Sequence, residues 1–299
     1  MRILVATDGS ACADRARDLV GSVPWPTPTE IRLVAAIEEG PALFGSPWIP
    51  AVPADADRYE EEAVDHLRGV LERGAVALFG PDRTVETVLL RASPARAIVE
   101  EMREWGPDLT VLGSRGHGPV ETTLLGSTSS AVVDHATNPV LIARGDRVTR
   151  AILAEDGSPG ARNAETLILR WPLFAGVPVD VVSVVDVAAP WRTGIAPTMF
   201  GQAMDVYTDM ITSAHETHES LAASTATRLR DAGITAEMEL REGDPAAEIV
   251  AAAAESGADL ILIGSRGHTG ITRLVLGSVA HSILTHAHCS VLVIRRHLA

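Results

Sequence analysis

The sequence contains one glycine-rich motif twice, and the two copies lie 151 residues apart. The first copy begins at Gly113 and the second at Gly264, and both follow the pattern G-x2-G-x9-G-S. A repeat of this length in a chain of 299 residues indicates two copies of one domain. We therefore predict tandem domains over residues 1–146 and 147–299, joined by a short polar link near 145–149.

The spacing of the glycines is typical of a loop that approaches a ligand closely and then opens a helix. Glycine adopts positive φ without strain and has no Cβ to hold a ligand away. A Gly-Ser pair at a helix start leaves backbone N–H groups and the positive end of the helix dipole facing the loop, which suits a phosphate. The alternative is that the glycines only turn a tight corner. That alternative accounts for one glycine per loop and poorly for three spaced glycines followed by serine in both halves.

Short apolar runs alternate with helical patterns in the same order in both halves. We expect the strands of the first half near 3–6, 31–37, 85–90, 108–113 and 138–143, and those of the second near 151–154, 179–185, 236–240, 260–263 and 291–294. Such alternation predicts an α/β fold with parallel strands and right-handed crossovers. We predict two doubly wound domains, each with a five-stranded parallel sheet in the order 3-2-1-4-5 and helices on both faces.

In this order the fifth strand of each domain is an edge with unpaired backbone N–H and C=O groups. Val140–Ala143 and Val291–Ile294 are the two edges, and both are apolar. Exposed apolar edges are usually covered in native proteins. We therefore expect the two fifth strands to pair with one another.

Composition excludes several classes of function. The formal charge of −14 argues against binding to nucleic acid or to an anionic membrane. All 25 basic residues are arginine, so neither a phosphate-binding Walker lysine nor a Schiff base is available. Two cysteines without metal-ligand spacing fit a reducing compartment. No apolar run is long enough for a signal peptide or a membrane span, and we expect a cytoplasmic protein.

Acidic residues follow the first strand of each half, at the position where a doubly wound sheet binds its ligand. These residues are Asp8 and Asp156, and each begins an Asp-Gly-Ser sequence. If the first and fourth strands are neighbours, each aspartate and its glycine motif frame one crevice at the carboxyl ends of the strands. The carboxylate could accept a hydrogen bond from a ribose hydroxyl or an adenine amine, and the glycine loop could hold phosphates.

With these residues the chain resembles a tandem member of the ATP-binding branch of the universal stress protein family over nearly its whole length. The family pattern has the same glycine motif, an Asp at the end of the first strand and a Val late in the second. The resemblance implies ATP, together with Mg²⁺, as the cofactor. It places adenine near the aspartate and the second strand, ribose and phosphates on the glycine loop, and the serine on a phosphate oxygen. The nucleotide-binding residues that it implies are Asp8, Ala36, Gly113, Gly116, Gly126, Ser127, Asp156, Val184, Gly264, Gly267, Gly277 and Ser278.

One position departs from the family pattern, because Ala36 stands in the first domain where Val184 stands in the second. Alanine can still serve a contact made through the backbone, but it packs less closely against adenine. The second domain matches the pattern in full.

We expect an ATP-binding stress-response regulatory protein, which forms a homodimer, responds to a protein partner and has no catalytic residues. The alternative is a slow ATPase or phosphotransferase that uses the same site. A third reading is a dimerisation scaffold with empty sites. His215 and His218 have the spacing of one helix face, but no carboxylate motif accompanies them. We therefore interpret them as helix-surface residues and predict no metal site.

Overall fold

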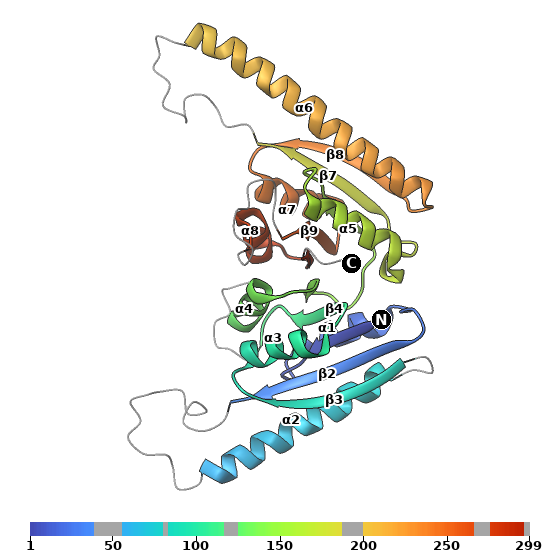
Figure 1. The fold of residues 1–299 in the computed structure, drawn as a ribbon, viewed down its shortest axis with the longest axis vertical. Coiled ribbons are helices and arrows are strands. Elements are labelled where there is room, and N and C mark those ends of the chain that lie inside the picture. Colours follow the sequence, from blue (N-terminus) through green and yellow to red (C-terminus); the bar gives the residue numbers. More distant parts are fainter. Residues whose placement is uncertain (39–55, 80–82, 117–124, 187–199, 266–275, 296–299) are drawn as a thin grey trace. The chain divides into compact units, whose positions relative to one another are not determined.

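The computed structural model describes the chain except for residues 39–55, 80–82, 117–124, 187–199, 266–275 and 296–299 (Figure 1). The chain forms two compact units. Unit 1 consists of Met1–Arg147, Thr272–Leu276 and Ser290–Ala299, and unit 2 consists of Val148–Ile271 and Gly277–Cys289. The domain boundary between residues 146 and 147 remains a prediction.

Unit 1 contains the predicted alternation of strands and helices. Its elements are β1 (Arg2–Ala6), α1 (Ala11–Ser22), β2 (Thr29–Ile37), α2 (Ala56–Leu78), β3 (Arg83–Arg91), α3 (Pro94–Trp105), β4 (Leu109–Gly113), α4 (Ser127–His135) and β5 (Val140–Ala143). The strands lie in the order β3-β2-β1-β4-β5 and run parallel. Helices α1 and α2 pack on one face of the sheet, while α3 and α4 pack against each other on the opposite face. The predicted order 3-2-1-4-5 is confirmed in this unit.

Unit 2 repeats the plan. Its elements are β6 (Ala151–Ala154), α5 (Pro159–Arg170), the short 3-10 helix η2 (Pro172–Phe174), β7 (Val179–Val185), α6 (Phe200–Asp231), β8 (Ala236–Glu242), α7 (Pro245–Ser256), β9 (Leu260–Gly264) and α8 (Ser278–His286). Its strands lie in the order β9-β6-β7-β8, and all three neighbouring pairs are parallel. The predicted α/β class is therefore confirmed.

The last strand, β10 (Ser290–Ile294), belongs to the second repeat by sequence but lies in unit 1. It pairs antiparallel with β5, with Val291 opposite Ile142 and Val293 opposite Val140. The predicted pairing of the fifth strands is thus confirmed. The structure differs from two separate five-stranded sheets, because β10 covers the apolar edge that β5 would otherwise expose.

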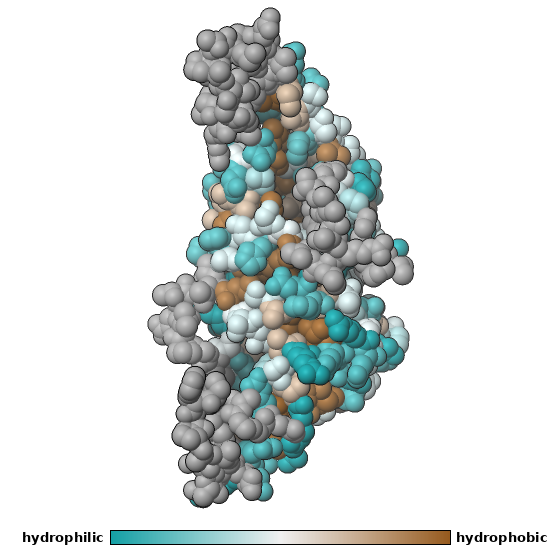
Figure 2. Space-filling model, turned by 60° about the vertical axis from the view of Figure 1, so that its left-hand side comes forward, coloured by the Kyte–Doolittle hydropathy of each residue, from teal (hydrophilic) through white to brown (hydrophobic). Residues whose placement is uncertain are grey.

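The central strands are buried on both faces, as expected for parallel strands covered by helices. Every residue of β4, β5, β7 and β10 is buried or nearly so. Large exposed hydrophobic side chains are few among the described residues, and Val76, Phe79 and Met210 are the most exposed of them. On the face drawn in Figure 2, hydrophobic residues of the described chain form small groups between hydrophilic ones. No described helix is long and apolar enough to cross a membrane.

Arg295, which follows β10, holds the C-terminal end of α4. Its side chain is only 5% exposed. Its Nη2 donates to the carbonyl oxygen of Val133 and, at 2.9 Å, to that of Asp134. The last carbonyl groups of a helix have no partner within the helix, and a cation at this end also complements the helix dipole. The tail of the second repeat therefore stabilises a helix of the first.

We predict that Arg295→Met lowers the free energy of unfolding of unit 1 by about 2 kcal/mol, because two buried carbonyl groups lose a charged donor. Urea unfolding followed by hydrogen exchange at the α4 amides measures the effect. The matched control is Arg147→Met at an exposed arginine, which should change stability by less than about 0.5 kcal/mol. Equal unfolding curves for Arg295→Met and the parent would contradict the prediction.

Candidate functional site

The loop after β1 is a tight turn that sets the position of Asp8. The Oδ1 atom of Asp8 accepts a hydrogen bond from the backbone N of Ser10 at 2.9 Å. Between them Gly9 has a φ of 79°, a conformation that favours glycine. Ser10 then caps α1, because its Oγ accepts from the N of Ala13 at 3.3 Å. The half-buried Asp8 carboxylate is therefore held by the backbone that follows it.

Two of the three glycines of the first motif, Gly113 and Gly116, pack too closely against their neighbours to carry a side chain. A Cβ on Gly113 would lie 2.6 Å from the carbonyl carbon of Cys12 in the first turn of α1. A Cβ on Gly116 would overlap Oδ2 of Asp8. The backbone N of Gly126 donates to the carbonyl oxygen of Ser114 at 2.7 Å and so closes the loop. The structure thus brings Asp8, Gly113, Gly116 and Gly126 together.

The two loops meet because β1 and β4 are hydrogen-bonded neighbours, with Ile3 opposite Leu109. The Oγ of Ser10 donates to the carbonyl oxygen of Arg115 at 3.3 Å, which links the loop after β1 to the glycine loop. Ala36 lies near the end of β2 at the same edge of the sheet, since the N of Thr7 donates to Val34 two residues earlier. This edge is the expected ligand position of a doubly wound sheet.

The helices that follow the two glycine motifs begin without a capping side chain. Gly126 is the N-cap of α4 and Gly277 is the N-cap of α8, and neither offers an acceptor to the first turn. By contrast, serines cap α1 and α5. The hydroxyl-bearing Ser127 and Ser278 are exposed at the first helical positions. An uncapped helix start combines N–H donors with the positive end of the dipole, so it favours an anion.

The second loop repeats this geometry as far as the structure describes it. The Oδ1 of Asp156 accepts from the N of Ser158 at 2.9 Å, and Gly157 has a φ of 76°. A Cβ on Gly264 would lie 2.9 Å from the Cα of Gly160 in α5. The N of Gly277 donates to the carbonyl oxygen of Ser265 at 2.9 Å. Val184 is buried near the end of β7. Gly267 lies outside the described residues.

Sequence reasoning missed Glu155, which precedes Asp156 and is 4% exposed. Its Oε1 accepts from the N of Gly157 at 2.7 Å, and its Oε2 accepts from Oγ1 of Thr225 at 2.9 Å. Burial raises the pKa of Glu155, and these two hydrogen bonds oppose the rise. The only sign of this role in the sequence is the position of Glu155 beside a predicted ligand residue. Its burial could not be predicted, because it depends on contacts with α6.

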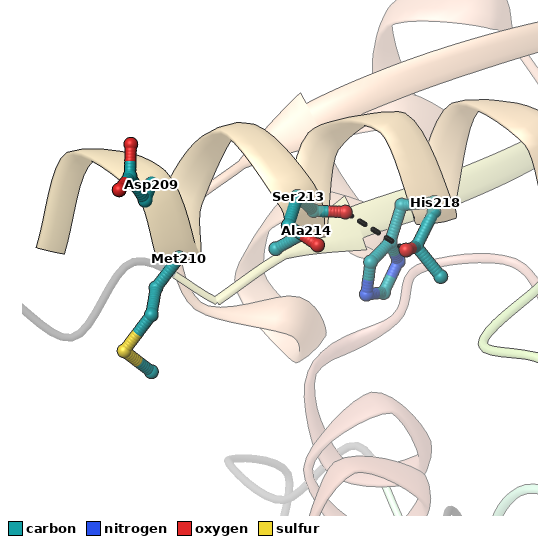
Figure 3. Close-up of a pocket in the computed structure, with 6 residues that line it drawn as sticks. Asp209, Met210, Ser213, Ala214 and His218 are labelled. Atoms are coloured by element: carbon teal, nitrogen blue, oxygen red, sulfur yellow. Dashed lines mark hydrogen bonds between the residues drawn. The ribbon is translucent and has the colours of Figure 1, made fainter. Parts of the chain in front are cut away.

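His218 also has a role that the sequence did not predict. Its Nδ1 lies 2.8 Å from Oγ of Ser183 on β7, and that hydroxyl donates to the carbonyl oxygen of Glu155 at 2.6 Å. Figure 3 shows His218 at one end of a groove along α6, with Ser213, Ala214, Met210 and Asp209 along it. The groove has a volume of 560 Å³. His218 therefore connects this groove to the start of the Asp156 loop.

His215 lies one turn earlier and pairs with a carboxylate instead. Its Nε2 lies 2.7 Å from Oε1 of Glu242, and its Nδ1 lies 2.9 Å from the carbonyl oxygen of Ile211. The backbone contact, followed by Glu242, raises the pKa of His215. Among the described residues no group of three or more His, Cys, Asp or Glu side chains could hold a metal ion.

Comparison with known proteins finds the same family in both repeats. Residues 1–144 and 148–295 each match the model of the universal stress protein family. A universal stress protein of Methanocaldococcus jannaschii is 47% identical over 64 residues, which are 21% of this chain and 38% of that protein. A universal stress protein of Thermus aquaticus is 34% identical over 142 residues, which are 48% of this chain and 97% of that protein.

A solved structure has the same fold over the whole chain. The crystal structure of a universal stress protein from Archaeoglobus fulgidus has a TM-score of 0.66 at 20% identity. The match covers 99% of this chain and 98% of that one. At this identity the comparison supports the shared two-domain α/β fold.

We predict that Gly113→Ala lowers the free energy of unfolding by about 1–3 kcal/mol, because its Cβ would press on backbone atoms of α1 that cannot rotate away. The control is Gly145→Ala, whose Cβ would lie 3.7 Å from its nearest neighbour, the carbonyl oxygen of Arg147. This control should cost less than about 0.5 kcal/mol. Thermal unfolding of both variants measures the difference, and equal stabilities would show that β4 and α1 are not in close contact.

Proposed function

Because the chain belongs to the universal stress protein family, we propose that it is an ATP-binding stress-response regulatory protein. Each domain would bind one nucleotide at the carboxyl ends of its first and fourth strands. The residues that would bind it are Asp8, Ala36, Gly113, Gly116, Gly126 and Ser127 in the first domain and Asp156, Val184, Gly264, Gly267, Gly277 and Ser278 in the second. Nucleotide binding would act by shifting the protein between conformations or partner-binding states.

The contact between Asp8 and Gly116 carries the proposal. The loop after β1 and the loop after β4 approach so closely that a side chain at Gly116 would displace the Asp8 carboxylate. A glycine that serves only as a turn does not require a carboxylate against its Cα. A bare glycine beside a carboxylate and an uncapped helix start supplies an acceptor for ribose or adenine and donors for phosphate at one edge of the sheet.

The described residues fit the parts of a nucleotide. The first-turn N–H groups of α4 and α8, with the exposed hydroxyls of Ser127 and Ser278, suit phosphate oxygens. Val184 gives the second site an apolar wall for adenine, while the smaller Ala36 leaves the first site less closely packed. Bound Mg²⁺ would add positive charge at the phosphates. The arrangement of donors therefore supports ATP despite the acidic surface.

The site favours binding over turnover. Each aspartate uses Oδ1 to accept an amide of its own loop, which is a positioning role. With no lysine in the chain, no lysine side chain can neutralise the charge that develops when a phosphoryl group is transferred. We also propose that the protein is cytoplasmic, that it forms a homodimer and that it regulates a protein partner.

We predict two ATP sites per chain. Isothermal titration of nucleotide-stripped protein should give a stoichiometry near two, with the first site weaker because Ala36 packs less closely than Val184. Ala36→Val should then strengthen the first site and leave the second unchanged. A stoichiometry of zero would overturn the proposed function, and a stoichiometry of one would restrict it to one domain.

We predict that Asp156→Ala weakens ATP binding at the second site by about 1–2 kcal/mol, the scale of a lost charge-assisted hydrogen bond. Asp156→Asn is the matched control, because its amide oxygen can still accept from the N of Ser158 and so preserve the turn. The asparagine variant should fall between the alanine variant and the parent. Titration calorimetry measures all three, and unchanged affinity in Asp156→Ala would remove this residue from the site.

A further inference from the structure

The two aspartate loops have the same shape but are held by different chemistry. In unit 1 the backbone N of Gly9 donates to Oγ1 of Thr7 at 3.2 Å. In unit 2 the backbone N of Gly157 donates to Oε1 of Glu155 at 2.7 Å. A neutral hydroxyl therefore accepts the glycine amide in the first loop, and an ionisable carboxyl group accepts it in the second.

The helix that packs against each loop differs in the same way, with an apolar side chain in unit 1 and a hydroxyl donor in unit 2. In unit 1 a Cβ on Gly9 would lie 2.9 Å from Cγ2 of Val70, so an apolar side chain of α2 faces the loop. In unit 2 the facing helix α6 provides Thr225, which is 1% exposed and donates to Oε2 of Glu155. The interior of unit 2 is thus built to receive a carboxyl group, because both of its oxygen atoms have a hydrogen-bond donor.

The charged and titratable groups near Glu155 come from its own loop, from α5 and from α6. Asp156 on its own loop and Glu165 on α5 both disfavour its ionisation. Arg228 on α6 pairs with Glu165 through Nε at 2.5 Å and Nη2 at 2.9 Å, and its Nη2 also donates to Oγ1 of Thr225 at 2.8 Å. His218 on α6 is hydrogen-bonded to Ser183, whose hydroxyl donates to the backbone carbonyl oxygen of Glu155.

We propose that Glu155 is a positioning residue of the second nucleotide loop, whose carboxylate holds the Gly157 amide and makes this amide respond to pH, whereas the neutral Thr7 gives the Gly9 amide no such response. The consequence for nucleotide binding rests on the proposed function. The response of the loop itself does not, because it depends only on hydrogen bonds within unit 2. The two repeats would then differ in how they respond to acidification.

The direction of the response follows from charge and burial. An ionised carboxylate accepts an amide hydrogen bond more strongly than a neutral carboxyl group does. Burial, as the largest influence, raises the pKa of Glu155, so protonation occurs at a higher pH than for an exposed glutamate. Acidification through that raised pKa therefore loosens the Gly157 amide. The folded state binds the proton of the Glu155 carboxyl group more tightly than the unfolded state does. The contribution of Glu155 to the free energy of unfolding of unit 2 is therefore largest at low pH and is lost as the pH rises through the raised pKa.

The test is a pH titration of the glycine amides by NMR in the full-length chain labelled with ¹⁵N-glycine. Gly157 is expected to show an amide-proton shift with a midpoint above the range of exposed glutamates. Gly9 is the internal control, because it sits in the same turn beside an equivalent aspartate. A Gly157 resonance that follows the same titration curve as Gly9 would overturn the proposal, and this comparison needs no substitution.

Two variants separate the charge from the hydrogen bond. Glu155→Gln keeps an oxygen acceptor but cannot titrate, so the extra transition at Gly157 should disappear. Glu155→Thr installs the side chain found at Thr7, so Gly157 should behave like Gly9. Persistence of the transition in both variants would assign it to another group and overturn the proposal.

ATP titrations of the same proteins connect the loop to binding. At neutral pH, Glu155→Ala, which leaves the Gly157 amide without its acceptor, should weaken second-site affinity about fivefold, the effect of one lost hydrogen bond, and Glu155→Thr, which restores an acceptor, should weaken it less. If the amide titrates as expected but ATP does not bind the parent, the proposed function fails and the positioning role stands. If ATP binds at two sites and the Gly157 amide does not titrate, the positioning role fails alone.

Discussion

The hydrogen-bonded pairing of the first strand with the fourth is the constraint on which the candidate site depends. Because β1 lies beside β4, and β6 beside β9, segments that are more than 100 residues apart reach the same edge of a sheet. Parallel pairing then places both carboxyl ends together, so that Asp8 contacts Gly116. The glycines make this approach sterically feasible, and Gly113 does the same for the helix behind them. Without this pairing, the aspartate and the glycine motif would be unrelated loops.

The last strand of the second repeat contributes to the stability of the first unit. Strand β10 comes from the second repeat but completes unit 1 as the antiparallel partner of β5. Arg295 extends the same segment to the C-terminal carbonyl groups of α4. Helix α4 begins at the other end with the glycine motif. The helix that begins at the first candidate site is therefore held at its other end by a residue more than 160 positions later in the sequence.

Similarity of motif does not make the two repeats equivalent. Their Asp-Gly-Ser turns contain the same hydrogen bond, in which Oδ1 of the aspartate accepts from the serine amide at 2.9 Å. The residue before the aspartate is Thr7 in the first repeat and Glu155 in the second, and the side chains packed against the two loops differ accordingly. In the first loop Gly9 faces the apolar Val70 of α2, whereas in the second Glu155 accepts from Thr225, which in turn accepts from Arg228. A polar network of this kind is stable only when each member has a partner, so these residues belong to one arrangement.

The sequence by itself determined the repeat and the class of fold, and it predicted the strand order of the first unit and the aspartate and glycine loops that meet at one edge of its sheet. The repeat, the fold class and the two loops follow from local signals: apolar runs, glycine spacing, and an Asp-Gly-Ser turn that needs one residue at positive φ. Only the tertiary structure decided that β10 joins unit 1, that Glu155 is buried and that His218 bonds to Ser183. Each of these depends on contacts between distant segments, such as the 70 positions between Glu155 and Thr225. A glutamate reads as a surface residue in a sequence, and only the helix that packs over it and supplies its donor makes it part of the interior.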